Sequence, residues 1–119
     1  MKHLILATLF MISITGCSKN GLHDTMESMG SSFKTMRGSD EITALKSELK
    51  TFTASYNIAK NQKVNTEDQP MFNEGMKELN QLLNQLKTHI DAGDVQKSKE
   101  VLKQLGKVRK KYHEKLGVK

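Results

Sequence analysis

The two residues of this chain with the clearest chemical potential are a histidine near its end and a methionine early in its helical part. His113 ends the basic segment 109–113, Arg-Lys-Lys-Tyr-His, most of which is typical of a solvated helix end. It lies eleven positions after Leu102, so on a helix the two side chains are only roughly 20° apart. His113 therefore falls in an apolar stripe, where an imidazole requires a partner or a function such as metal binding.

The chain around these residues predicts helices throughout. It has 119 residues, which favours one domain, and its low content of glycine (8) and proline (1) favours helix. Apolar residues recur at spacings of three and four in four segments, near 22–36, 42–59, 72–90 and 94–116. The intervening turns contain typical capping residues, including Gly93 as a left-handed C-terminal turn. The candidate N-caps of the last three segments are Ser39 or Asp40, Thr66 or Asp68, and Asp94.

Four such segments joined by short loops predict an all-α fold, an antiparallel up-and-down four-helix bundle. The start of the first helix, the loop between the second and third, and the end of the fourth then share one end of the bundle. Met26 lies about one turn into the first helix and His113 about one turn before the end of the fourth. Both face inward from neighbouring helices, so a thioether and an imidazole are expected to converge.

This donor pair suits a haem iron. Imidazole and thioether fill both axial positions, and methionine raises the reduction potential relative to two histidines. With both positions filled, we expect one-electron transfer and no enzymatic turnover. Zinc would require more donors, and copper usually more than one sulfur or imidazole. The porphyrin would also need apolar walls and a cation for its propionates, for which the candidates are Met29, Phe33, Tyr56, Phe72, Met76, Leu116 and Arg109.

The segments 22–29 (Leu-His-Asp-Thr-Met-Glu-Ser-Met) and 109–113 resemble the two haem-ligand segments of the cytochrome b562 family of periplasmic b-type cytochromes. The resemblance extends over nearly all of the chain after residue 16. It implies one noncovalent haem b per chain, held by Met26 and His113. The segment 61–70 is shorter than in the family, and Gly117 stands where the family has a basic residue. The haem-binding residues expected on this hypothesis are Met26, Met29, Phe33, Phe72, Met76, Arg109, Tyr112 and His113, with Met29 as the alternative sulfur donor.

Residues 1–16 are predicted to be a lipoprotein signal peptide. Lys2 and His3 precede an apolar run, 4–14, that is too short to span a bilayer. The run ends in Ile-Thr-Gly before Cys17, which resembles the bacterial lipobox. We therefore expect a lipidated Cys17, a four-helix haem-binding domain at 17–119, and a periplasmic protein anchored, by analogy with other lipoproteins that have serine at the next position, in the outer membrane. The alternative is an ordinary secretory signal with an incidental cysteine.

Charge and cysteine content restrict the remaining functions. The single cysteine excludes a disulfide within the chain and the Cys-x-x-Cys-His motif of covalent haem attachment. The formal net charge is +6, but the basic residues are spread over several helices with no interleaved aromatics, so we expect no nucleic acid. Redox partner proteins, at the membrane or in solution, and the membrane itself are the expected contacts. The alternatives are a cofactor-free helical lipoprotein acting as an adaptor or binding module, and a haem storage or sensing protein.

Overall fold

The structure, a computed structural model, describes residues 17–118, and their side chains from residue 21 onward. The expected signal peptide, 1–16, and the expected lipidation of the Cys17 side chain therefore lie outside what it describes. None of the described helices is long and apolar enough to cross a membrane.

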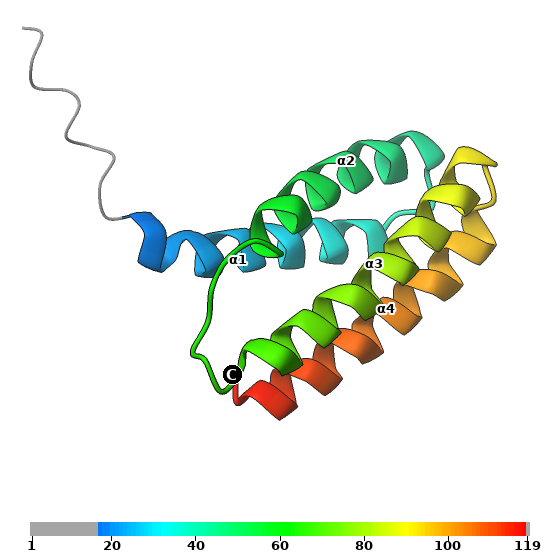
Figure 1. Ribbon diagram of the computed structural model, residues 1–119. Helices are drawn as coiled ribbons and strands as arrows, with labels where there is room; N and C mark the ends of the chain where they lie inside the picture. Colours follow the sequence, from blue (N-terminus) through cyan, green and yellow to red (C-terminus); the bar gives the residue numbers. More distant parts are fainter. Residues whose placement is uncertain (1–16, 119) are drawn as a thin grey trace, which may run out of the picture.

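Four helices make up the described chain: α1 (Cys17–Arg37), α2 (Ile42–Ala59), α3 (Gln69–Asp91) and α4 (Val95–Leu116) (Figure 1). Each runs antiparallel to the one before it, and residues 17–118 contain no strand. The predicted all-α four-helix bundle is confirmed. The first helix begins five residues before Leu22, its first expected apolar position.

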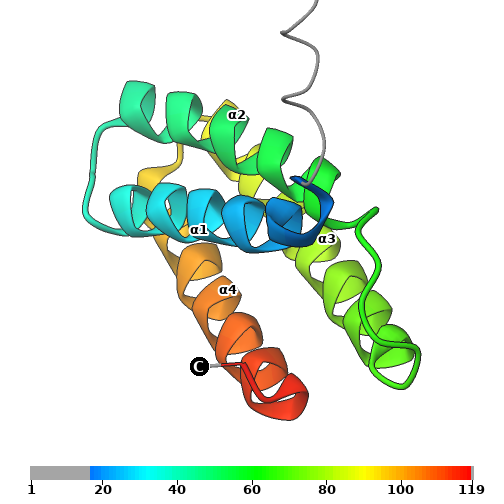
Figure 2. The ribbon, with the colours of Figure 1, turned by 90° about the vertical axis from the view of Figure 1, so that its left-hand side faces the viewer.

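The helices associate as two hairpins. α1 packs closely against α2 and α3 against α4, whereas the two hairpins contact each other much less. They meet at the end that contains the α1–α2 and α3–α4 turns, and both views show them diverging toward the opposite end (Figures 1 and 2). At that diverging end lie the start of α1, the connection from α2 to α3, and the end of α4, as the loop lengths predicted.

The apolar stripes form one core that is densest where the hairpins meet. Met36, Leu45, Leu86 and Ile90 have no exposed side-chain surface. They come from the end of α1, the start of α2 and the end of α3, which are neighbours at the closed end. Burial of this kind contributes roughly 1.5–3 kcal/mol for each large apolar side chain. The closed end is therefore the stable anchor of the fold.

A lysine from α4 adds a polar connection at the same closed end. The Lys99 Nζ donates hydrogen bonds to the carbonyl oxygens of Met36 (3.2 Å), Arg37 and Ser39 (2.7 Å). It also forms an ion pair with Asp40 at 3.5 Å. Carbonyls at the end of a helix have no partner within the helix, so Lys99 caps α1 from the other hairpin.

The helix caps agree only partly with the sequence-based expectation. Asp94 caps α4, since its Oδ1 accepts from the Lys97 backbone N–H at 3.0 Å, and Gly93 is left-handed with φ 73°. Asp68 occupies the N-cap of α3 without a side-chain bond. The expected cap of α2 at Ser39 or Asp40 was wrong: Glu41 is the N-cap. The Ser39 hydroxyl instead accepts from the Glu41 N–H within the turn that precedes the helix, at 3.1 Å.

Candidate functional site

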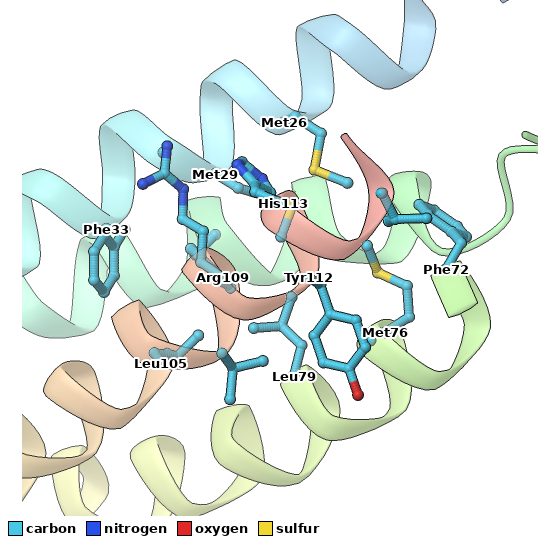
Figure 3. A pocket seen from close by; sticks show the side chains of 15 residues that line it. Met26, Met29, Phe33, Phe72, Met76, Leu79, Leu105, Arg109, Tyr112 and His113 are labelled. Atoms are coloured by element: carbon cyan, nitrogen blue, oxygen red, sulfur yellow. The ribbon is translucent and has the colours of Figure 1, made fainter. Parts of the chain in front are cut away.

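A cavity lies between the two hairpins at the diverging end and has a volume of about 90 Å³ (Figure 3). All four helices contribute to its wall, which is almost entirely apolar. The residues that line it are Met26, Met29, Gly30, Phe33, Phe52, Phe72, Gly75, Met76, Leu79, Leu105, Val108, Arg109, Tyr112, His113 and Leu116.

The structure brings Met26 and His113 to this one cavity. Met26 reaches it from α1 and His113 from α4, and each side chain is half-buried. They are separated by most of the chain, so only the antiparallel packing of the first and last helices makes them neighbours (Figure 3). A thioether and an imidazole from different helices thus face a common apolar space.

The surroundings of His113 favour its neutral form. Burial, together with the nearby positive charge of Arg109, lowers the pKa of the imidazole below its ordinary value of 6.5. The ring is therefore uncharged near neutral pH and keeps a nitrogen lone pair for a metal. Arg109 lies one turn earlier on α4 and is exposed at the rim of the cavity.

The other predicted site residues are also at the cavity, with one exception. The cavity wall includes all eight residues expected to bind a cofactor, and Leu116. Tyr56, expected as a further wall, does not line it. The Tyr56 side chain is buried between α2 and α3, where its hydroxyl donates to the Met76 carbonyl at 2.9 Å. Tyr56 thus supports the helix that carries Met76, and Phe52, one turn earlier, occupies the wall in its place.

Tyr112 forms a rigid side of the cavity. Its hydroxyl lies 3.2 Å from the Glu74 carboxylate, and burial followed by the charge of Glu74 raises the pKa of the phenol. Its ring packs directly on Gly75, where a Cβ atom would lie 2.9 Å from the Tyr112 Cγ. On the neighbouring turn, Lys111 binds the Glu78 carboxylate, with the Lys111 Nζ 2.9 Å from Oε1. These contacts hold α3 and α4 together next to His113.

Some residues of the cavity could not be recognised as such from the sequence. Phe52, Leu79 and Leu105 belong to the apolar stripes and were expected only as core, and Val108 was not singled out at all. The two glycines carried a weak signal, since a glycine inside an apolar helical pattern indicates a close approach or an open space. Gly75 provides the close approach to Tyr112, whereas a Cβ at Gly30 would meet nothing within 4 Å.

The model of one protein family, described as Cytochrome b562, matches residues 21–116. The chain belongs to the cytochrome b562 family. The matched range contains most of α1, all of α2, α3 and α4, and the whole cavity wall. The members of this family are haem-binding cytochromes that act as electron carriers. A search of curated proteins returned no significant match.

The residues at the cavity fit haem in donor type and in wall chemistry. Among residues whose side chains are described, no group of three or more His, Cys, Asp or Glu is placed to hold a metal ion. The donors of the cavity are instead one neutral imidazole and thioethers, which complement the four nitrogens of a porphyrin. The volume of about 90 Å³ is well below the roughly 300–1,000 Å³ of cofactor pockets. To hold a haem, the hairpins would therefore have to lie further apart at their diverging end.

Proposed function

We propose that this chain is a b-type cytochrome that binds one haem b noncovalently, with Met26 and His113 as axial ligands, and carries single electrons in the periplasm. The observation that supports it most is the pairing of a thioether and a neutral imidazole on one apolar cavity. Membership of a haem-binding family gives the second support.

Each part of the cavity has a role in this proposal. When bound, haem supplies a one-electron iron couple. His113 presents an uncharged nitrogen, and Met26 raises the reduction potential relative to a second imidazole. Phe33, Phe72 and Tyr112 would exclude water from a bound haem, and Arg109 at the rim could pair with a propionate. If Met26 and His113 both held the iron, the chemistry of the bound group would be electron transfer and not binding of a substrate.

A basic groove beside the cavity supports an acidic redox partner. It runs between α1 and α4, has a volume of about 570 Å³, and shares Phe33, Arg109 and His113 with the cavity. Its basic residues outnumber its single acid, Glu114. They are Arg37, Lys103, Lys107, Arg109 and Lys110. Such a surface attracts an acidic protein and orients it toward the haem edge.

The lipobox-like sequence supports anchoring of the protein at the outer membrane through Cys17, facing the periplasm. α1 begins at Cys17, and Met26 follows nine residues later on the same helix, about 14 Å along its axis. A lipid at Cys17 would hold the cavity end close to the membrane surface. That position suits exchange of electrons with a membrane-bound partner.

The decisive experiment compares reduced-minus-oxidised absorption spectra of purified variants. We expect a six-coordinate low-spin spectrum for the wild type and its loss in both His113→Ala and Met26→Ala. His23→Ala and Met36→Leu are the matched controls, because His23 is exposed and Met36 is buried away from the cavity. Both controls should keep the wild-type spectrum.

Three results would reject parts of this proposal. A wild type without any Soret band, even after addition of haemin, would favour the cofactor-free adaptor. A low-spin spectrum that survives in Met26→Ala but disappears in Met29→Ala would transfer the sulfur ligand to Met29. Slow electron exchange in a correctly ligated protein would favour haem storage or sensing.

A further inference from the structure

Three methionine sulfurs, not one, are available at the cavity. Met26 and Met29 reach it from α1, and Met76 reaches it from α3 (Figure 3). His113 completes the set from α4. From the sequence, Met29 was only an alternative to Met26 as the sulfur donor, and Met76 was only a wall residue, because both fit apolar stripes in which methionine is ordinary core packing. Their common cavity changes the donor count from one thioether to three.

This donor set matches the preferences of monovalent copper. Thioethers are soft ligands that select Cu(I), and imidazole also suits copper. Copper usually requires more than one sulfur or imidazole, and Met29 and Met76 meet that requirement here. Zinc sites in proteins use thiolates, imidazoles and carboxylates, of which this cavity offers only His113.

The size and polarity of the cavity also favour a single Cu(I) ion. A volume of about 90 Å³ holds a single ion without separation of the hairpins, unlike a porphyrin. Since all four donors are neutral when His113 is deprotonated, the site would carry only the single charge of the ion, which limits the cost of burial. Methionine side chains have three rotatable bonds, so the sulfurs can adjust to the metal.

We propose that the haem-free protein binds one Cu(I) ion in this cavity through Met26, Met29, Met76 and His113. Copper binding differs in function from haem binding but uses the same Met26 and His113. One molecule of the protein can therefore bind haem or Cu(I), but not both at once. All four donors of the copper site belong to the protein. The copper proposal therefore does not depend on whether the protein also binds haem.

The test is a competition for Cu(I) between the full-length haem-free protein and bicinchoninate, under ascorbate and without oxygen. We expect the protein to withdraw one equivalent of Cu(I) from the coloured complex. Met29→Leu and Met76→Leu should each weaken binding more than about tenfold, because even partners outside the coordination shell affect metal affinity by that amount. Met36→Leu is the control, since Met36 is fully buried but absent from the cavity wall. Circular dichroism of each variant verifies that it is folded.

The outcomes separate this site from the proposed haem function. X-ray absorption of the copper complex should detect sulfur and nitrogen neighbours, and the haem-loaded protein should take up no Cu(I). The inference is overturned if the wild type leaves the coloured complex intact, or if the double variant Met29→Leu/Met76→Leu or the haem-loaded protein binds Cu(I) as tightly as the haem-free wild type. Cu(I) binding with no haem binding would reject only the haem proposal.

Discussion

At the scale of single residues, the same amino acid acquires its role from what lies across the cavity. His113 and His23 are both helical histidines, but only His113 adjoins an apolar cavity and a buried thioether. Likewise Gly75 and Gly30 both interrupt apolar helices, but only Gly75 is covered by an aromatic ring. Replacement of each of these two glycines by alanine should therefore have opposite effects on the stability of the protein.

Gly75→Ala should destabilise the haem-free protein, because its Cβ would lie 2.9 Å from the Tyr112 Cγ and push the ring out of place. Overpacking of this kind costs about 1–3 kcal/mol. Gly30→Ala should instead stabilise the protein by about 0.5–1 kcal/mol, since its Cβ meets nothing within 4 Å and alanine is the better helix former. Urea unfolding of both variants checks the signs. Equal stabilities would contradict the close packing of α3 on Tyr112.

At the scale of elements, the two hairpins are joined unequally at their two ends. The closed end has the fully buried side chains of Met36, Leu45 and Ile90, and the bonds from Lys99 to the last carbonyls of α1. The diverging end has a cavity and little contact between the hairpins. The two hairpins are therefore held together mainly at the closed end.

Lys99→Met should therefore weaken the joint between the hairpins. The carbonyls of Met36 and Ser39 lose their charged donor, and we expect the free energy of unfolding to fall by about 1–3 kcal/mol. Lys103→Met is the control, because Lys103 is exposed one turn further along α4. Urea unfolding measures the loss, and hydrogen exchange should rise at the α1–α2 turn. The same stability for both variants would show that Lys99 does not cap α1.

At the scale of the whole molecule, the cavity and the start of α1 lie at the diverging end of the bundle, and the basic groove extends from Arg37 to His113 beside the cavity. A ligand at this end ties the two hairpins together across their weakest contact. An anchor at Cys17 would bring the same end to the membrane, where a partner could approach along the groove. The proposed site, partner surface and tether are thus compatible in one orientation.

Cys17→Ser should release the protein from the membrane, because serine cannot carry a thioether-linked lipid. Fractionation of cells should find the wild type with the outer membrane and the variant in the soluble periplasmic fraction. Ser18→Ala retains the cysteine and should remain with the membranes. Haem spectra should be the same for all three proteins. A wild type already in the soluble fraction would show that Cys17 is an incidental cysteine.

Much of the fold followed from the sequence because its signals are local. The spacing of apolar residues defined four helices, and Gly93 with Asp94 defined the turn before α4. The short connections required antiparallel neighbours, which placed Met26 and His113 at a common end. The misplaced cap of α2 reflects a local ambiguity, since Ser39 forms an equally good hydrogen bond inside a turn.

Only the tertiary structure decided how the hairpins cross, and with that the composition of the cavity. Helical periodicity tells which face of a helix is buried but not which residues of other helices it meets. Tyr56 and Phe52 share one stripe of α2, yet only Phe52 reaches the cavity, because Tyr56 bonds to the Met76 carbonyl. For the same reason, the sequence could name Met29 only as an alternative to Met26, whereas the structure shows that the side chains of Met26, Met29 and Met76 share one small space between α1 and α3.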